Sequence, residues 1–124
     1  MSGNQKLGRT GEEAALRVLM QKGYVCVGRN VRVGQDELDL VMRDGAVTVF
    51  VEVKLRGPGE RGVYAVDRAK RRRICRAAVV YMMNTGGLER PARFDVVEIA
   101  FDGARMNVHH IEDAFPLEGG RYFV

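Results

Sequence analysis

The alternation of apolar and polar positions is clearest over residues 37–54, where two alternating segments flank the dipeptide Asp44-Gly45. Alternating segments joined by Asp-Gly are a strong signal for a β-hairpin with a two-residue loop. A loop made of those two residues alone would pair Arg43 with Ala46 and so set the register of both strands. The pattern therefore predicts an antiparallel pair of strands in the middle of the chain.

This register sorts the side chains onto two faces, because residues alternate with period two along a strand. On one face, Glu37 would lie directly opposite Glu52, and Asp39 would lie on the diagonal, roughly 7–8 Å away. Lys54 would follow Glu52 on that face, roughly 7 Å along the strand. The other face would be wholly apolar and would hold Leu38, Leu40, Met42, Val49, Val51 and Val53.

The charged face is a candidate metal site. Like charges opposite one another destabilise a sheet unless something offsets them, and hard cations such as Mg²⁺ or Mn²⁺ bind carboxylate oxygens. The same pattern is compatible with solvated charges on a half-exposed sheet. Two observations favour the site: residues 47–51 are nearly continuously apolar, which is typical of a strand covered on both faces, and Glu52 and Lys54 end that run, where ligands bind in α/β sheets.

Helical patterns flank these strands. Thr10, followed by Glu13 three positions later, predicts a capping box at the start of a first helix, and Gly23 is expected to end that helix. Glu12 falls on the apolar stripe of this helix, which is expected to face the sheet. It is either a member of the acidic cluster or an acid of the first turn whose charge interacts favourably with the helix dipole.

A second helix is predicted from about residue 65 to residue 84. Its buried stripe would hold Val66, Ala69, Ile74, Ala77, Ala78 and Tyr81. Its other side is a basic ridge, which either binds phosphates or is simply solvated. The ridge consists of Arg68, Arg71, Arg72 and Arg76, with no acid between them. Lys70 aligns with the apolar stripe, so we expect it to point toward the sheet and to contact a phosphate.

The remaining segments complete an alternating order of elements. Residues 24–28 predict a first strand, which leads into a loop containing Arg29 and Arg32. Residues 93–101 and 106–111 predict two further strands, joined by a turn at residues 102–103. Residues 55–63 are glycine-rich and carry Arg56 and Arg61; this loop either closes on a substrate or only connects a strand to a helix.

The residues also resemble a known family. The order Asp39, then Glu52 and Lys54, resembles the Asp…Glu-x-Lys signature of restriction-endonuclease-like nucleases. Nearly the whole chain resembles the small bacterial YraN-type proteins, which are similar to archaeal Holliday-junction resolvases. The matching blocks are residues 8–12, 23–24, 29–30, the hairpin, Lys70, residues 77–78, Tyr81 and residues 93–97. One departure is that Asp36 stands where the family has glycine, while the glycine here is Gly34.

The element order gives an α/β fold, and the resemblance implies a restriction-endonuclease-like one, α-β-β-β-α-β-β, with a mixed central sheet flanked by helices. It further implies that Asp39, Glu52 and the backbone carbonyl of Val53 hold Mg²⁺ (or Mn²⁺). Lys54 would assist catalysis, and Glu37 and Glu12 would complete the acidic shell.

The function expected from this resemblance is metal-dependent hydrolysis of phosphodiester bonds in structured, branched or junction DNA, in repair or recombination. The alternative is a non-cleaving nucleic-acid-binding module with the same fold. Both would use a set of basic residues to bind phosphates. This set is Arg56, Arg61, Arg68, Lys70, Arg71, Arg72 and Arg76.

Composition sets the remaining expectations. A length of 124 residues fits a single domain, 1–124, with loose tails at about 1–6 and 117–124. No apolar run approaches the ~20 residues needed to span a membrane, and no secretory signal is evident. Cys26 and Cys75 lack metal-ligand spacing and are expected to be reduced thiols, so a cytoplasmic location is predicted.

The charge also points to a polyanionic partner. The net charge is +4, and nine of the twenty Lys and Arg residues lie between Lys54 and Arg76, directly after the acids. We therefore expect nucleic acid, and in particular DNA, as the partner. A homodimer is a further possibility, because cutting two strands of a junction symmetrically favours twofold symmetry.

Overall fold

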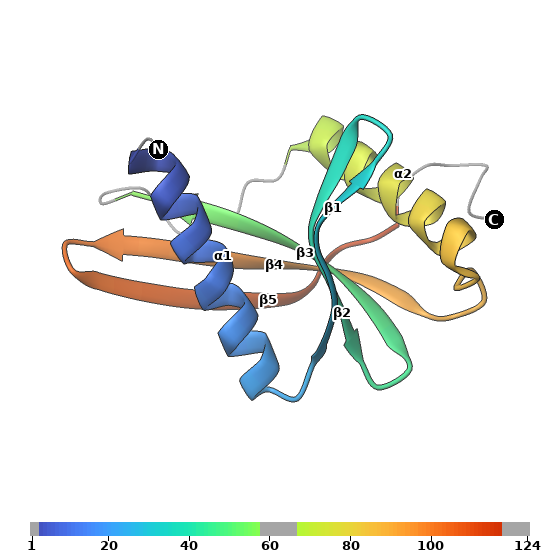
Figure 1. The fold of residues 1–124 in the computed structure, drawn as a ribbon, viewed down its shortest axis with the longest axis horizontal. Helices are drawn as coiled ribbons and strands as arrows, with labels where there is room; N and C mark the ends of the chain where they lie inside the picture. Colours follow the sequence, from blue (N-terminus) through green and yellow to red (C-terminus); the bar gives the residue numbers. More distant parts are fainter. Residues whose placement is uncertain (1–2, 58–66, 118–124) are drawn as a thin grey trace.

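The structure is a computed structural model that describes residues 3–57 and 67–117, which form two helices and one five-stranded sheet (Figure 1). The predicted α/β class and the order α-β-β-β-α-β-β are confirmed. The elements are α1 (Gly3–Gln21), β1 (Val25–Val33), β2 (Asp36–Asp44), β3 (Val47–Arg56), α2 (Arg68–Thr85), β4 (Ala92–Asp102) and β5 (Arg105–Phe115).

The five strands lie side by side in chain order, β1-β2-β3-β4-β5. Neighbouring strands are antiparallel except β3 and β4, which are parallel. A parallel pair needs a crossover connection, and the segment containing α2 provides it. The predicted mixed sheet is therefore confirmed.

The two helices cover opposite faces of the sheet, and each seals an apolar cluster (Figure 1). The cluster under α1 includes Ala15, Leu19, Leu40, Met42, Val49, Val51, Val97 and Ile99. The cluster under α2 includes Val41, Phe50, Ile74, Ala77, Ala78, Phe94, Val96 and Phe115. The central strand β3 contributes to both clusters, so the prediction from its continuous apolar run, a strand covered on both faces, is confirmed.

The predicted hairpin register was wrong by two residues. Asp44 pairs with Val47 and Leu40 pairs with Val51, so the loop is Gly45-Ala46 and not Asp44-Gly45. The reason is the turn type: Gly45 has φ of +59° and Ala46 has no positive φ, as in a type II′ turn, whose first loop residue is glycine. Continued by one pair, the observed register places Asp39, rather than Glu37, opposite Glu52.

Leu38 also departs from the predicted face. It packs in the α2-side cluster, whereas Leu40 and Met42 pack under α1. The pairing of β2 with β3 ends at Leu40 and Val51, and β2 then continues paired with β1 alone. Two-stranded ribbons twist more strongly than sheets, so strict alternation fails beyond the point where the strands separate.

Three predicted element boundaries were wrong. Helix α1 begins at Gly3 instead of Thr10, because the Thr-x-x-Glu spacing also occurs inside helices, where residues three apart are neighbours. Strand β1 continues to Val33 across a bulge after Cys26, so the expected arginine loop is part of a strand. Helix α2 begins at Arg68, and Ala69 in its first turn is exposed, not buried as predicted. Residues 58–66, which include Val66 and Arg61, lie outside the described residues.

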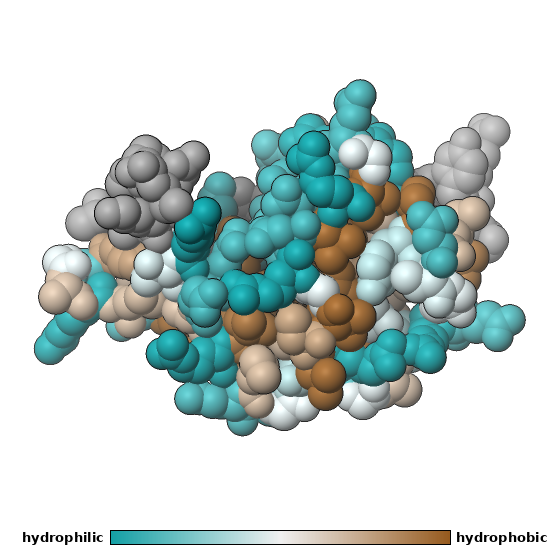
Figure 2. Space-filling view, viewed as in Figure 1, coloured by the Kyte–Doolittle hydropathy of each residue, from teal (hydrophilic) through white to brown (hydrophobic). Residues whose placement is uncertain are grey.

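The remaining features of the fold are the surface of the sheet edge, the cysteines and the apolar length of the helices. Hydrophobic side chains gather over the middle of one face (Figure 2), where β1 forms the sheet edge and exposes Val25 and Val27. Neither Cys26 nor Cys75 forms a disulfide bond within the described part of the chain. Within the described residues, neither α1 nor α2 is long and apolar enough to cross a membrane.

Candidate active site

A pair of carboxyl groups, Asp39 on β2 and Glu52 on β3, lies where these two strands separate. The Val53 amide donates a hydrogen bond of 2.9 Å to Asp39 Oδ2. Burial, repulsion from Glu52 and a hydrogen bond shared with Glu52 together raise the pKa of Asp39 to about 7, although the Val53 amide and Lys70 lower it. The Asp39 carboxyl therefore holds its proton up to nearly neutral pH.

Lys70 is the base that contacts this pair. Its Nζ lies 3.3 Å from Glu52 Oε1, and the Glu52 side chain is only 11% exposed. Lys70 belongs to the first turn of α2, where Asp67 caps the helix by accepting a hydrogen bond of 2.8 Å from the Lys70 amide. Lys70 thus points toward the sheet, as its alignment predicted, and its partner there is a carboxylate.

Two further acids approach from the α1 side. Burial raises the pKa of Glu12, a hydrogen bond from the Asn30 side chain opposes this, and repulsion from Asp39 and Glu37 adds to it. Glu37 itself lies 3.9 Å from Arg32. Asn30 was not identified as a site residue from the sequence. Its φ is +49°, a conformation that asparagine adopts more readily than most residues.

The predicted catalytic Lys54 is exposed, and no described residue forms a hydrogen bond or an ion pair with it. Its neighbour across the parallel ladder is Glu98, which is 1% exposed. Among the residues that the structure describes, none forms a hydrogen bond with either Glu98 side-chain oxygen, and Arg56 Nε lies 3.6 Å from Glu98 Oε2. The sequence did not reveal Glu98 because it sits within an apolar run that reads as an ordinary buried strand.

The residues present fit a hard divalent cation that keeps much of its water shell. Among the described residues, no three His, Cys, Asp or Glu side chains are gathered in a metal-binding arrangement. Asp39 and Glu52 still offer two half-buried carboxylates whose repulsion a cation would relieve. Mg²⁺ is commonly held by one or two carboxylates together with waters.

Comparison with known sequences gives the family. The sequence model of the uncharacterised protein family UPF0102 matches residues 11–99. The chain belongs to the UPF0102 family. A UPF0102 protein of Anaeromyxobacter dehalogenans is 42% identical over 119 residues, which cover 94% of this chain and 89% of the relative.

Other UPF0102 relatives are similar over comparable lengths. A protein of Symbiobacterium thermophilum is 42% identical, over 90% of this chain and 98% of its own. A protein of Halorhodospira halophila is 46% identical, over 90% of this chain and 88% of its own. The predicted resemblance to the small bacterial YraN-type proteins is thereby confirmed, and the span matched to UPF0102 contains every proposed acid and Lys54.

The basic ridge of this UPF0102 chain is partly neutralised, which corrects the expectation that no acid would balance it. Arg76 pairs with Asp36 of β2 at 3.2 Å, an acid distant in sequence that the fold brings to the ridge. Arg71 lies over the ring of Phe115, 5.5 Å from its centre. Arg68 and Arg72 are exposed, and they remain candidates for phosphate contact.

A second polar cluster surrounds Asp95 near the start of β4. Asp95 is fully buried and accepts hydrogen bonds from Arg93 Nε at 3.0 Å and from the Asp113 amide at 3.0 Å, and His110 Nε2 lies 2.7 Å from it. Arg93 also contacts the Tyr24 hydroxyl. The buried polar atoms of this cluster all have hydrogen-bond partners, so we interpret the cluster as structural.

Proposed function

We propose that this UPF0102 protein is a metal-dependent nuclease that hydrolyses phosphodiester bonds in structured DNA. The observation that carries the proposal is the half-buried Asp39–Glu52 pair, with the pKa of Asp39 raised to about 7. Placing two like charges together out of water is unfavourable for folding. Perturbed carboxyl groups of this kind are concentrated at functional sites.

In this proposal Asp39, Glu52 and the carbonyl of Val53 hold Mg²⁺ or Mn²⁺. When bound, such an ion supplies Lewis-acid chemistry: it lowers the pKa of a coordinated water and offsets charge on a phosphate. Lys54 would donate hydrogen bonds to the phosphate oxygens as negative charge develops on them. Lys70, already in contact with Glu52, would hold that carboxylate in place.

The substrate class rests on charge and on family resemblance. Exposed arginines on α2 lie next to the first turn that carries Lys70, so a nucleic-acid backbone bound along α2 would pass the acids. The likeness of the sequence blocks to archaeal Holliday-junction resolvases supports branched DNA as the substrate.

A non-cleaving DNA-binding module is the second candidate. The ion pair between Lys70 and Glu52 favours it, because Lys70 already offsets one of the two carboxylates without a metal. This candidate uses the same basic surface but predicts no turnover with any divalent ion.

The test is cleavage of a synthetic four-way DNA junction in the presence of Mg²⁺ or Mn²⁺. We expect cleavage by the wild type and a loss of at least about a hundredfold in Asp39→Asn and Lys54→Ala, because these substitutions remove a metal ligand and a phosphate contact. Glu13→Gln is the matched control, since Glu13 is an exposed acid of α1 that pairs with Arg29; it should cleave normally.

The outcomes separate the candidates. Junction binding without cleavage by the wild type would support the binding module. Failure to bind the junction at about 50 mM salt would exclude both, because phosphate contacts are strong at low salt. If Lys70→Gln abolishes cleavage while Lys54→Ala retains it, the catalytic lysine has been assigned to the wrong element.

A further inference from the structure

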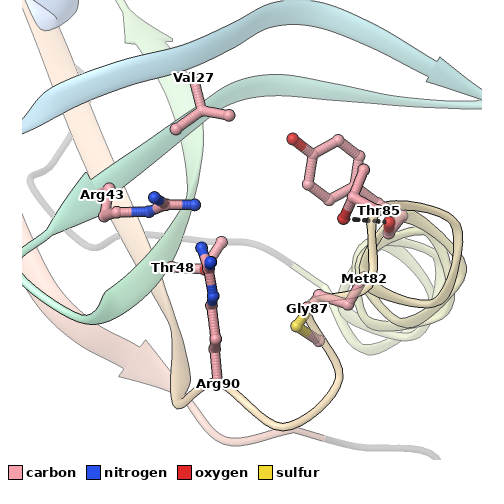
Figure 3. A pocket seen from close by; sticks show the side chains of 8 residues that line it. Val27, Arg43, Thr48, Met82, Thr85, Gly87 and Arg90 are labelled. Atoms are coloured by element: carbon pink, nitrogen blue, oxygen red, sulfur yellow. Dashed lines mark hydrogen bonds between the residues drawn. The ribbon is translucent and has the colours of Figure 1, made fainter.

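A cavity of about 220 Å³ lies between the sheet and the C-terminal half of α2. Its lining includes Val27 of β1, Arg43 of β2, Thr48 of β3, Tyr81 of α2 and Arg90 of the following loop (Figure 3). Tyr81 follows Lys70 by eleven positions on α2, roughly 16 Å along the helix axis. The cavity is therefore separate from the acidic pair.

Two guanidinium groups point into this cavity, those of Arg43 and Arg90 (Figure 3). No acid is among the described residues that line it, and neither arginine side chain has a hydrogen bond or ion pair with any of the described residues. Arg43 Nε is buried without a partner. Asp44, the next residue along β2, binds Arg93 at 3.1 Å and so does not compensate Arg43.

The end of α2 offsets only part of this charge. The C-terminus of a helix carries a partial charge of roughly −0.5, and the cavity lies against the last turns of α2. Two arginines bring two full positive charges, because a guanidinium keeps its proton in proteins. A net positive charge therefore remains in a partly enclosed space, where solvent screens it less than at an open surface.

The geometry points to a binding site for a phosphate group in this cavity, with Arg43 and Arg90 as its two forked donors. Guanidinium groups match phosphate oxygens in pairs of hydrogen bonds. Thr48 is buried at the cavity floor and Tyr81 is held by an edge contact with Phe50, so both offer hydroxyl groups from fixed positions. The volume lies below the range for drug-sized ligands and suits a small anion or one end of a larger one.

The phosphate has two possible sources that share this chemistry. It is either a backbone phosphate of bound nucleic acid, which extends the proposed function and rests on it, or a terminal or free phosphate, which does not. The loop of Arg90 is shaped by a hydrogen bond of 3.0 Å from its amide to the Gly87 carbonyl, so Arg90 is supplied by a turn formed before any ligand binds.

The experiment is a titration of the full chain with inorganic phosphate, followed by backbone amide NMR, for the wild type, Arg43→Gln, Arg90→Gln and Arg105→Gln. We expect saturable shifts around the cavity, and a loss of affinity of about tenfold or more in the first two variants, as for a charge-assisted hydrogen-bonded pair. Arg105 is exposed at the β4–β5 turn and serves as the matched control; its variant should bind like the wild type.

A second arm separates the sources. If the ligand is a backbone phosphate, each cavity variant lowers the slope of log K against log salt for duplex DNA by about 0.9. If it is a terminal phosphate, that slope is unchanged and the wild type prefers a 5′-phosphorylated oligonucleotide, a preference that both variants lose.

Phosphate binding that is absent in the wild type, or equal in the wild type and Arg90→Gln, would overturn the inference. Arg90 is exposed, so its variant should fold even if Arg43→Gln does not. Asp39→Asn should abolish cleavage and still bind inorganic phosphate, which distinguishes a failed active site from a failed anion site.

Discussion

Asp39 is a carboxyl group whose place in the fold makes the stability of the protein depend on pH. Its pKa is about 7 in the folded chain, against 3.8 for an ordinary aspartate. Between those values the folded state retains a proton that the unfolded state has released. Since the unfolded state then binds fewer protons, the free energy of unfolding falls as the pH rises from about 4 to about 7.

We therefore expect Asp39→Asn to remove this part of the pH dependence. The stability of the wild type relative to the variant should decrease by a few kcal/mol between about pH 4.5 and pH 7.5, at roughly 1.4 kcal/mol per pKa unit. Urea unfolding at several pH values measures this, and Mg²⁺ should restore wild-type stability at the upper end. Parallel pH profiles for the two proteins would contradict the assignment.

Asp95 is the opposite case among the buried acids. Burial alone would raise its pKa, but hydrogen bonds with His110, Arg93 and the Asp113 amide together hold the pKa below its usual value. Its stabilising effect is therefore present at neutral pH and is lost as the pH falls through that lowered pKa. The comparison shows why Asp39 stands out. Asp95 has enough hydrogen-bond donors to stabilise its charged form, whereas Asp39 accepts a hydrogen bond from the Val53 amide and its pKa is raised.

At the scale of elements, the start of α2 determines how Lys70 is placed to contact Glu52. Asp67 accepts hydrogen bonds in the first turn, through its side chain from the Lys70 amide at 2.8 Å and through its carbonyl from the Arg71 amide at 2.9 Å. This cap fixes the turn that carries Lys70 to Glu52. The cap is local, yet its effect reaches the candidate active site.

We expect Asp67→Ala to lower the free energy of unfolding by about 1 kcal/mol, the usual cost of removing an N-cap side chain. Thermal or urea unfolding measures this. Glu89→Ala is a suitable control, because Glu89 is an exposed acid in the loop after α2 with no role in a cap, and its variant should change stability by less than about 0.5 kcal/mol. Equal losses in both variants would mean that the cap contributes nothing beyond its charge.

At the scale of the whole molecule, the fold redistributes the charge that the sequence concentrates after Lys54. Arg76 is paired with Asp36, the first residue of β2, which lies forty residues earlier in the chain. Arg72 lies one turn earlier on α2 and is exposed. Two arginines that look equivalent in the sequence are therefore not equivalent toward a polyanion.

This difference predicts unequal salt effects on DNA binding. Arg72→Ala should lower the slope of log K against log salt by about 0.9, the value for one lost phosphate contact. Arg76→Ala should change that slope by less, because its charge is already partly offset by Asp36. Fluorescence anisotropy with a labelled duplex between about 50 and 200 mM salt measures both. Equal changes in the slope would refute the role given to the ion pair.

Much of the architecture was predictable from local patterns. The continuous apolar run over residues 47–51 predicted a central strand covered on both faces, and the apolar stripes predicted both helices. Turn details were less predictable: both Asp-Gly pairs do mark hairpins, but glycine is the first loop residue in each, at Gly45 and Gly103. An Asp-Gly pair does not by itself say whether aspartate ends the strand or begins the loop, and this moved the register by two residues.

The candidate site was predictable in its acids and not in its partners. Asp39, Glu52 and Glu12 follow from alternation and helical spacing, which are local properties. Their contacts with Lys70 and Asn30, the burial of Glu98 beside Lys54 and the pairing of Arg76 with Asp36 join residues far apart in the chain. Such contacts depend on where each element docks, and one sequence without an alignment carries little information about that.

The residue order alone determined the fold class, the order of elements and which acids stand on the inner strands, because these follow from periodicity and turn chemistry within short segments. Tertiary structure decided which acid lies opposite Glu52, which lysine reaches it and which arginines remain without an acid. Those outcomes depend on strand register, on the docking of α2 and on the resulting burial, and the energies of burial and charge exist only once distant segments have come together.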